Sequence, residues 1–172
     1  ISYIELEQLI YVLKNKLNKS YLKKIYHYDG LWLFKFNHHS FIYDPGNSIW
    51  VGSFFEREDG KNLHSICKKL RKEISDKKLI DINIFDNDRT VVLEFKNYKL
   101  VFELYAQGNM ILIDNNNKII KVHREIKKKG NDNNNYIREH GMIYHFKEYK
   151  NYDNYKLMNY GWKINNIEVT ND

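Results

Sequence analysis

Residues 80–123 decide the fold, and they read IDINIFDNDRTVVLEFKNYKLVFELYAQGNMILIDNNNKIIKVH. Short runs of apolar and β-branched residues alternate there with clusters of Asn, Asp and Gly, the residues that turns favour. The runs predict five strands, at 80–85, 90–95, 100–105, 110–113 and 119–123. Such even spacing is typical of an antiparallel meander in a sandwich or half barrel.

The chain before this meander begins with an amphipathic pattern. Apolar residues recur at intervals of three and four, which places them on one face of a helix: Leu6, Leu9, Ile10, Leu13 and Leu17. Ser2 and Glu5 have the spacing of a capping box, and Ile1 with Leu6 has that of a hydrophobic staple. The pattern predicts a helix over residues 3–17.

Two hairpins are expected after this helix. Aromatic and β-branched runs predict strands at 21–28, 31–36, 40–43 and 49–52. Asp29-Gly30 separates the first two runs, and Pro45-Gly46 lies between the last two. Both dipeptides favour tight turns, so each pair of runs is predicted to form an antiparallel hairpin.

A second helix is expected to begin at Asn62 as its N-cap. Its apolar face consists of Leu63, Ile66, Leu70 and Ile74. Basic residues crowd the other face or the exit of the helix: Lys68, Lys69, Arg71, Lys72, Lys77 and Lys78. This side is either a solvated face or a surface that binds anions.

The composition fits one globular domain. The chain has 172 residues, 42% of them hydrophobic and 15% aromatic, which is enough to fill a core. The order of the elements predicts the α+β class, as an antiparallel β-sandwich with flanking helices. After the meander the pattern is weak, and we expect one strand near 143–146 followed by an irregular tail.

Charge and cysteine usage limit the function further. A single cysteine, Cys67, excludes a disulfide framework and a multi-cysteine zinc site. Apolar runs are far shorter than the roughly 20 residues that span a bilayer, and no signal peptide is evident, so a cytoplasmic protein without membrane contact is expected. The net charge of +6 suggests an anionic partner. A start at Ile1 instead of Met suggests a piece of something longer.

Three strings stand out in order and spacing: KLRK at 69–72, DRTVV at 88–92 and FELYAQGNMILID at 102–114. Together with Arg124, which closes the following strand, they resemble the NFACT-N domain. That domain opens the proteins known as NEMF in animals, RqcH in some bacteria and the FbpA group once described as fibronectin-binding. The start Ile-Ser-Tyr-Ile-Glu is similar to the family start, with Glu5 where most members carry Asp. The resemblance covers residues 1–146, and 147–172 is expected to be an extension or the start of a linker.

The resemblance implies a fold similar to the N-terminal domain of the formamidopyrimidine-DNA glycosylases. It also implies ribosome-associated quality control, in which relatives bind tRNA and the large ribosomal subunit with peptidyl-tRNA and support mRNA-independent C-terminal tailing of stalled chains. Because peptide-bond chemistry stays with the ribosome, the module is expected to be a binder without cofactor or metal, not an enzyme. An E3 ubiquitin ligase partner would act through further domains that family members carry.

Three residues are candidates for tRNA binding. Asp88 and Arg89 match the family's Asp-Arg pair, which is associated with tRNA recruitment, and an Arg side chain can contact phosphate or a base edge with two hydrogen bonds. Without the resemblance, the spacing favours a structural interpretation, in which Asp88 belongs to a turn and Arg89 begins a strand. Glu5 matches the family acid and equally suits the capping box.

Candidate contacts to the RNA backbone are Lys68, Lys69, Arg71, Lys72, Arg124 and Lys127. They could form one phosphate-binding surface if the second helix and the last strand lie together. The alternative is a solvated lysine face without a ligand, and the sequence leaves both open.

Other motifs favour structural roles. Gly108-Asn109 is interpreted as a turn rather than a phosphate cradle, and Glu103 and Asp114 are expected to face solvent or to satisfy a turn. The seven histidines show no metal spacing. A glycosylase is excluded because those enzymes use an N-terminal proline amine as nucleophile. The alternative function is a stand-alone protein-interaction module, adhesin-like or a scaffold, that kept the NFACT-N fold.

Overall fold

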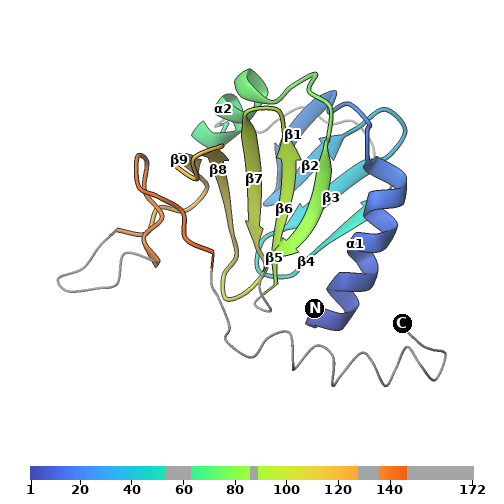
Figure 1. The fold of residues 1–172 in the computed structure, drawn as a ribbon, viewed down its shortest axis with the longest axis horizontal. Helices are drawn as coiled ribbons and strands as arrows, with labels where there is room; N and C mark the ends of the chain where they lie inside the picture. Colours follow the sequence, from blue (N-terminus) through green and yellow to red (C-terminus); the bar gives the residue numbers. More distant parts are fainter. Residues whose placement is uncertain (53–62, 86–88, 128–135, 147–172) are drawn as a thin grey trace.

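The computed structural model describes residues 1–52, 63–85, 89–127 and 136–146. Within these residues it contains two antiparallel sheets that pack face to face and two helices beside them (Figure 1). The predicted α+β sandwich with flanking helices is therefore confirmed. Its likeness to the glycosylase domain stays a prediction. Among the described helices, none is long and apolar enough to cross a membrane.

The first sheet has the strand order β1-β2-β3-β4. Its strands are β1 (Lys24–Tyr28), β2 (Leu31–Lys35), β3 (Ser40–Asp44) and β4 (Ser48–Gly52). Asp29 and Gly30 both have positive φ angles, of 52° and 81°, as the type I′ hairpin turn requires. The two predicted hairpins are confirmed.

The second sheet is the predicted meander, in the order β5-β6-β7-β8-β9. Its strands are β5 (Asp81–Phe85), β6 (Thr90–Phe95), β7 (Tyr98–Glu103), β8 (Asn109–Asp114) and β9 (Ile119–Val122). Tyr98 pairs with Phe95, so β7 begins two residues before the strand predicted at 100–105 and the turn is confined to residues 96–97. Asn97 takes the positive φ of that turn, 72°.

Helix α1 (Tyr3–Leu17) has the predicted bounds, and its capping box is complete. It buries Leu6, Ile10, Leu13 and Leu17 and runs along β5 at the edge of the second sheet (Figure 1). The apolar stripe predicted from spacing is thus the stripe that packs.

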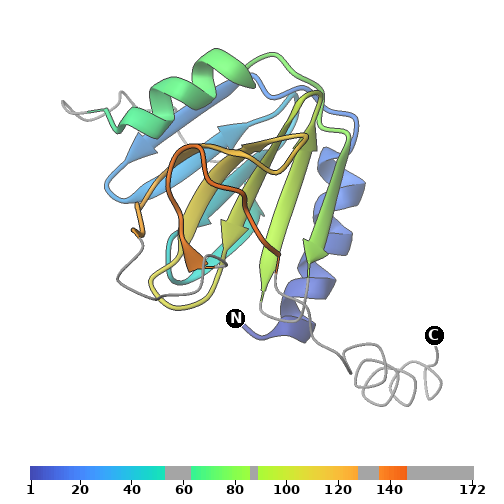
Figure 2. The same ribbon diagram turned by 60° about the vertical axis from the view of Figure 1, so that its left-hand side comes forward.

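Helix α2 (Ser65–Glu73) begins at His64, whose ring accepts a hydrogen bond from Ile66 N–H. The prediction that Asn62 caps it is wrong, and Asn62 itself lies outside the described residues. Leu63 precedes the helix and is only partly buried. Ile66, Cys67 and Leu70 are buried as α2 packs on β1 and β9 (Figure 2).

The main core lies between the two sheets and is rich in aromatic rings. Phe34, Phe41, Tyr43 and Phe102 are fully buried. The rings of Phe41 and Phe102 lie 5.3 Å apart, and those of Tyr43 and Phe102 lie 4.8 Å apart in an edge-on arrangement. These contacts join the sheets through side chains from β2, β3 and β7.

Residues 136–146 form a strap that crosses the outer face of the second sheet (Figure 2). Tyr144 packs there on Val92, Val101 and Ile111. The prediction of a strand near 143–146 is wrong, because within this range only Ile143 makes a β-bridge, which joins it to Lys118. The strap is instead held by separate hydrogen bonds, such as Tyr144 N–H to Asn117 O at 2.7 Å.

Candidate functional site

Arg89 lies at the start of β6 and reaches the N-terminal end of α1. Its Nη1 donates a hydrogen bond of 3.2 Å to the carbonyl oxygen of Ile1, and its own carbonyl accepts one of 3.0 Å from Leu104 N–H. A positive φ of 62° turns the chain into the strand at this residue. The fold therefore brings the strand-start arginine to the first turn of the first helix.

Glu5 lies in that same first turn and is exposed. Its Oε1 accepts from Ser2 N–H and its N–H donates to Ser2 Oγ, both at 3.1 Å. Hydrogen bonds with Ser2 lower the pKa of the Glu5 carboxyl, so it is charged at neutral pH. Glu5 therefore performs the capping role that its spacing from Ser2 predicts. Asp88, the other residue of the Asp-Arg pair, lies outside the described residues.

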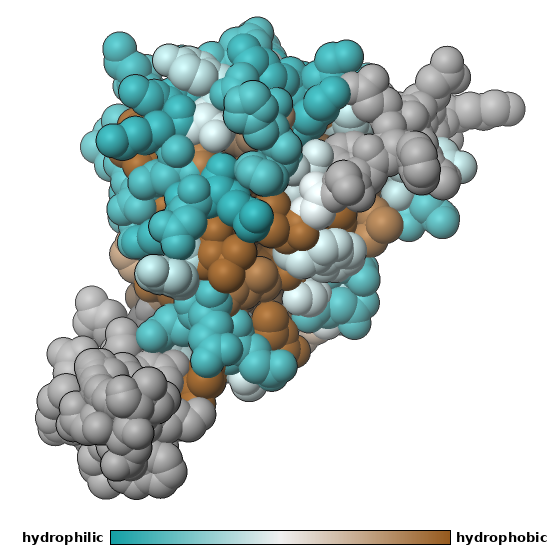
Figure 3. All heavy atoms as spheres, turned by 90° about the vertical axis from the view of Figure 1, so that its right-hand side faces the viewer, coloured by the Kyte–Doolittle hydropathy of each residue, from teal (hydrophilic) through white to brown (hydrophobic). Residues whose placement is uncertain are grey.

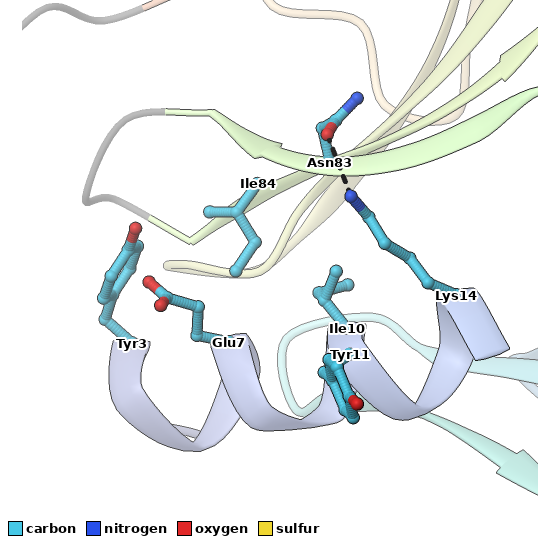
Figure 4. A pocket seen from close by; sticks show the side chains of 7 residues that line it. All are labelled: Tyr3, Glu7, Ile10, Tyr11, Lys14, Asn83 and Ile84. Carbon is cyan, nitrogen blue, oxygen red and sulfur yellow. Dashed lines mark hydrogen bonds between the residues drawn. The ribbon is translucent and has the colours of Figure 1, made fainter. Parts of the chain in front are cut away.

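A groove of about 320 Å³ runs between α1 and β5 and starts at this end of the helix (Figure 4). It is lined by Tyr3, Glu7, Ile10, Tyr11, Lys14, Asn83 and Ile84. Ile10 and Ile84 approach each other from helix and strand and supply an apolar floor (Figure 4). The groove thus combines an apolar floor with phenol, carboxylate, amide and ammonium groups.

The far end of the groove is closed by charged and polar contacts. Lys14 Nζ lies 3.4 Å from Asn83 Oδ1 and 3.6 Å from Asp81 Oδ1. Although burial disfavours the charge of Asp81, hydrogen bonds from Asn83 and Ile82 N–H, with the charge of Lys14, lower its pKa. Asp81 is therefore ionised at neutral pH, and its ion pair with Lys14 ties α1 to β5.

Helix α2 and β9 do lie together, so the condition for one basic surface is met. The two arginines of this candidate surface, however, donate hydrogen bonds to backbone carbonyl groups. Arg71 donates from Nε and Nη2 to Ile25 O at 3.0 and 2.7 Å, and Arg124 donates from the same atoms to Gly108 O at 3.0 and 2.9 Å. Both guanidinium groups thus connect elements of the fold.

The four candidate lysines differ from one another. Lys69 pairs with Glu73 at 3.0 Å, and Lys127 pairs with Glu125 at 3.5 Å. Lys68 and Lys72 are exposed on α2. Because Lys69 and Lys127 are paired with carboxylates, Lys68 and Lys72 are the lysines of this set best placed to contact a phosphate.

The Gly108-Asn109 motif is a structural turn. Gly108 has a φ of 79°, and a Cβ there would clash with the backbone nitrogen of Gly46. Asn109 is buried, with Oδ1 accepting from the N–H groups of Met110 and Arg124 and Nδ2 donating to Arg124 O. The turn interpretation is confirmed, because these bonds occupy the Asn109 amide.

Glu103 does not face solvent as expected, because it is buried and its Oε2 has four polar contacts, of which three are hydrogen bonds and one is an ion-pair contact. The partner atoms are Arg138 Nε at 2.9 Å, Arg138 Nη2 at 2.8 Å in the ion-pair contact, Tyr144 Oη at 2.6 Å and Tyr105 Oη at 3.1 Å. The strap covers this face of the sheet, which alternation along β7 alone does not reveal. Asp114 does satisfy a turn, as its Oδ1 accepts from Asn116 and Lys118 N–H.

Sequence reasoning missed the groove residues, although a signal was present. Tyr3, Glu7 and Lys14 recur at intervals of four and seven along α1, beside the apolar stripe. It also missed the gathering of His27, His64 and His123, which come from three separate elements. Within the part of the chain described, no group of three His, Cys, Asp or Glu side chains is arranged to hold a metal ion.

Two curated proteins are similar in sequence to this chain. Ribosome quality control complex subunit 2 of Saccharomyces cerevisiae is 31% identical over 140 residues, which is 76% of this chain and 13% of that protein. The archaeal Rqc2 homolog aRqcH of Methanocaldococcus jannaschii is 40% identical over 70 residues, or 38% of this chain and 10% of that protein. The chain thus spans a small part of these relatives.

Solved structures share the fold at low sequence identity. The N-terminal domain of fibronectin-binding protein PavA from Streptococcus pneumoniae gives a TM-score of 0.74 at 16% identity, covering 92% of this chain and 72% of that one. The N-terminal part of the fibronectin/fibrinogen-binding protein from Streptococcus suis gives 0.73 at 17% identity, covering 84% and 60%.

The family comparison agrees with the motifs at 69–72, 88–92 and 102–114. Residues 55–153 match the family described as "NFACT N-terminal and middle domains". This match spans more than half of the 172 residues, and the yeast relative aligns along most of the chain. The chain belongs to the NFACT-N family.

Proposed function

We propose that this chain is a non-catalytic binding module of cytoplasmic ribosome-associated quality control, which binds tRNA and the large ribosomal subunit. In this role it supports mRNA-independent C-terminal tailing of stalled nascent chains. The observation that carries the proposal is the hydrogen bond of Arg89, the arginine of the family's Asp-Arg pair, to Ile1 at the N-terminal end of α1, the helix that forms one wall of the groove.

The chemistry of this region suits RNA. An arginine side chain can donate hydrogen bonds to phosphate or to a base edge, and tyrosines supply faces on which bases stack. Tyr11 is 70% exposed beside the groove, and Tyr3 lies at its other end, in the first turn of α1. Lys14 lies on the same wall, where its ammonium group pairs with Asp81. The groove therefore offers stacking, hydrogen-bonding and charged groups within one short helix face.

The comparisons support the cellular setting. The yeast relative is named as a subunit of the ribosome quality control complex, and the archaeal one as a homolog of it. The chain matches only 13% and 10% of their lengths, so tailing and a ligase partner would depend on the other domains of such proteins. The role we propose for this segment is recognition alone.

Binding of total tRNA by the chain at low and moderate salt tests the proposal. We expect Asp88→Ala and Arg89→Ala each to weaken binding at least tenfold. The arginine can donate a double hydrogen bond to phosphate or base and the Asp88 carboxylate can accept from a base amino group, and such contacts are worth about 1–3 kcal/mol. Lys16→Ala is the matched control, since Lys16 is an exposed cation near the other end of α1. It should change affinity less than threefold.

Salt separates a built site from a diffuse basic surface. A surface making six to ten phosphate contacts would lose about a thousandfold or more in affinity between low and moderate salt. If the chain and all three variants bind equally and binding disappears with salt, the proposed tRNA site is contradicted. Binding that selects particular tRNAs and depends on Arg89 supports it.

A specific observation favours the protein-interaction module as the second candidate. Apolar surface lies on the face that carries α1 (Figure 3). Val12 of α1 is 39% exposed, and Trp50 of β4, a strand that contacts α1, is 38% exposed. The fold relatives from Streptococcus species are named as fibronectin- or fibrinogen-binding proteins. A chain that binds no RNA but loses a protein partner on Trp50→Ala would establish this alternative.

A further inference from the structure

Three histidines and a tryptophan gather where α2, β1 and β9 meet, and the proposed tRNA site uses none of them. The ring of His27 on β1 stacks on Trp32 at 4.0 Å between centroids and 10° between planes. His64, the N-cap of α2, and His123, directly after β9, have centroids 4.7 Å apart. The centroid of His27 lies 6.1 and 6.0 Å from those of His64 and His123.

His64 can cap the helix only while its ring is neutral. Its Nδ1 accepts the Ile66 N–H at 3.3 Å, and a protonated imidazole has no acceptor nitrogen to offer. A positive ring would also lie at the positive end of the helix dipole. Protonation of His64 therefore removes the cap and adds repulsion at the same place.

His123 has no compensation for a charge either. Its Nδ1 is buried and, like Trp32 Nε1, has no hydrogen-bond partner among the described residues. Burial, followed by the charges of His64, His27 and Arg124, lowers the pKa of His123 to about 4. Burial also lowers the pKa of His64, with Lys121 adding to the effect and a hydrogen bond to the His123 backbone opposing it.

Among the described residues, the titratable or charged groups that shift the pKa values of the two rings are basic. His27 faces them from β1, Lys121 from β9 and Arg124 from the segment after β9, while His64 and His123 face each other. The unfolded chain thus binds protons more tightly than the folded chain below the ordinary histidine pKa of about 6.5. The contribution of the neutral rings to the stability of the folded chain is therefore complete above that pH and is lost as the pH falls toward 4.

We infer that His27, His64 and His123 form a proton-sensitive latch, which fixes the N-terminus of α2 to β1 and the end of β9 while the rings are neutral and releases it on protonation. The exposed Lys68 and Lys72 lie one and two turns along the released helix. The latch itself does not depend on RNA binding.

Hydrogen exchange followed by NMR on the whole chain tests the latch. Protection of the Ile66 amide, corrected for the pH dependence of chemical exchange, should fall at least tenfold between pH 7 and pH 4.5. The Val101 amide in the core reports global unfolding, and its protection should stay constant over the same pH range. In His64→Asn, where the amide side chain caps at every pH, the fall should be less than threefold.

His38→Asn is the control, because His38 is an exposed histidine outside the cluster, and it should follow the unmodified chain. Equal falls in the unmodified chain and in His64→Asn would overturn the latch, as would constant protection of Ile66. A direct titration of the imidazole resonances keeps the test decisive even if His64→Asn does not fold. A His123 ring that titrates together with His38 would also overturn the inference.

Discussion

Glu103→Gln should lower the free energy of unfolding by about 3–5 kcal/mol, because it leaves a buried guanidinium without its counter-charge. The side chains of Glu103 and Arg138 are only 5% and 3% exposed and lie 2.8 Å apart. Burial disfavours the charge of Arg138, and in the unmodified chain the Glu103 carboxylate offsets this by raising the pKa of the arginine. In the variant the guanidinium loses that support but stays ionised, because arginine is not deprotonated in proteins. Urea denaturation followed by circular dichroism measures the loss.

Two tyrosines depend on the same carboxylate. Burial and the Glu103 charge raise the pKa values of Tyr105 and Tyr144, so both hydroxyl groups stay protonated and donate to it. Glu125→Gln is the control, since its exposed pair with Lys127 should contribute less than about 1 kcal/mol. If the two variants lose equally little stability, the network does not anchor the strap as described.

Gly108→Ala should cost about 3 kcal/mol or more, because two penalties coincide at this residue. The positive φ of 79° alone costs a side-chain-bearing residue roughly 1–2 kcal/mol. An added Cβ would also clash with Gly46 N and lie 3.1 Å from both Pro45 C and Tyr43 Oη. Since two of these contacts are backbone atoms of the facing turn, relief requires the two loops to separate.

Gly30→Ala isolates the conformational part of this cost. Gly30 has a similar φ of 81°, but nothing lies within 4 Å of the Cβ position. Thermal or urea unfolding of both variants should therefore show a loss of roughly 1–2 kcal/mol for Gly30→Ala and a clearly larger one for Gly108→Ala. Equal losses would show that the turns at Gly46 and Gly108 do not approach as closely as in this structure.

Sequence patterns predicted the elements well because their causes are local. The capping box of Ser2 and Glu5 spans three residues, and the hairpin turn at Asp29-Gly30 spans two. Strand β6 follows from a continuous β-branched and apolar run, and its predicted bounds are those observed. The cap of α2 was missed because a histidine serves there instead of the more usual Asn, Asp, Ser or Thr.

The site was predicted only in part because its contacts join distant residues. Arg89 meets Ile1 across 88 positions, and Lys14 meets Asn83 across 69. The family motif identified Arg89 but contains no information on the groove, which exists only once α1 lies against β5. Similarly, Glu103 seemed solvent-facing because its partner Arg138 follows 35 residues later, on the strap.

Site-specific photo-crosslinking shows where on the molecule tRNA binds. A benzophenone amino acid at the position of Tyr11, beside the groove, is compared with the same group at Tyr21, which is 43% exposed elsewhere. After irradiation with total tRNA and a ribosome fraction, tRNA binding at the groove predicts tRNA crosslinks from position 11 that disappear with Arg89→Ala, and few from position 21. Equal crosslinking from both positions, or crosslinks to protein alone, would contradict it.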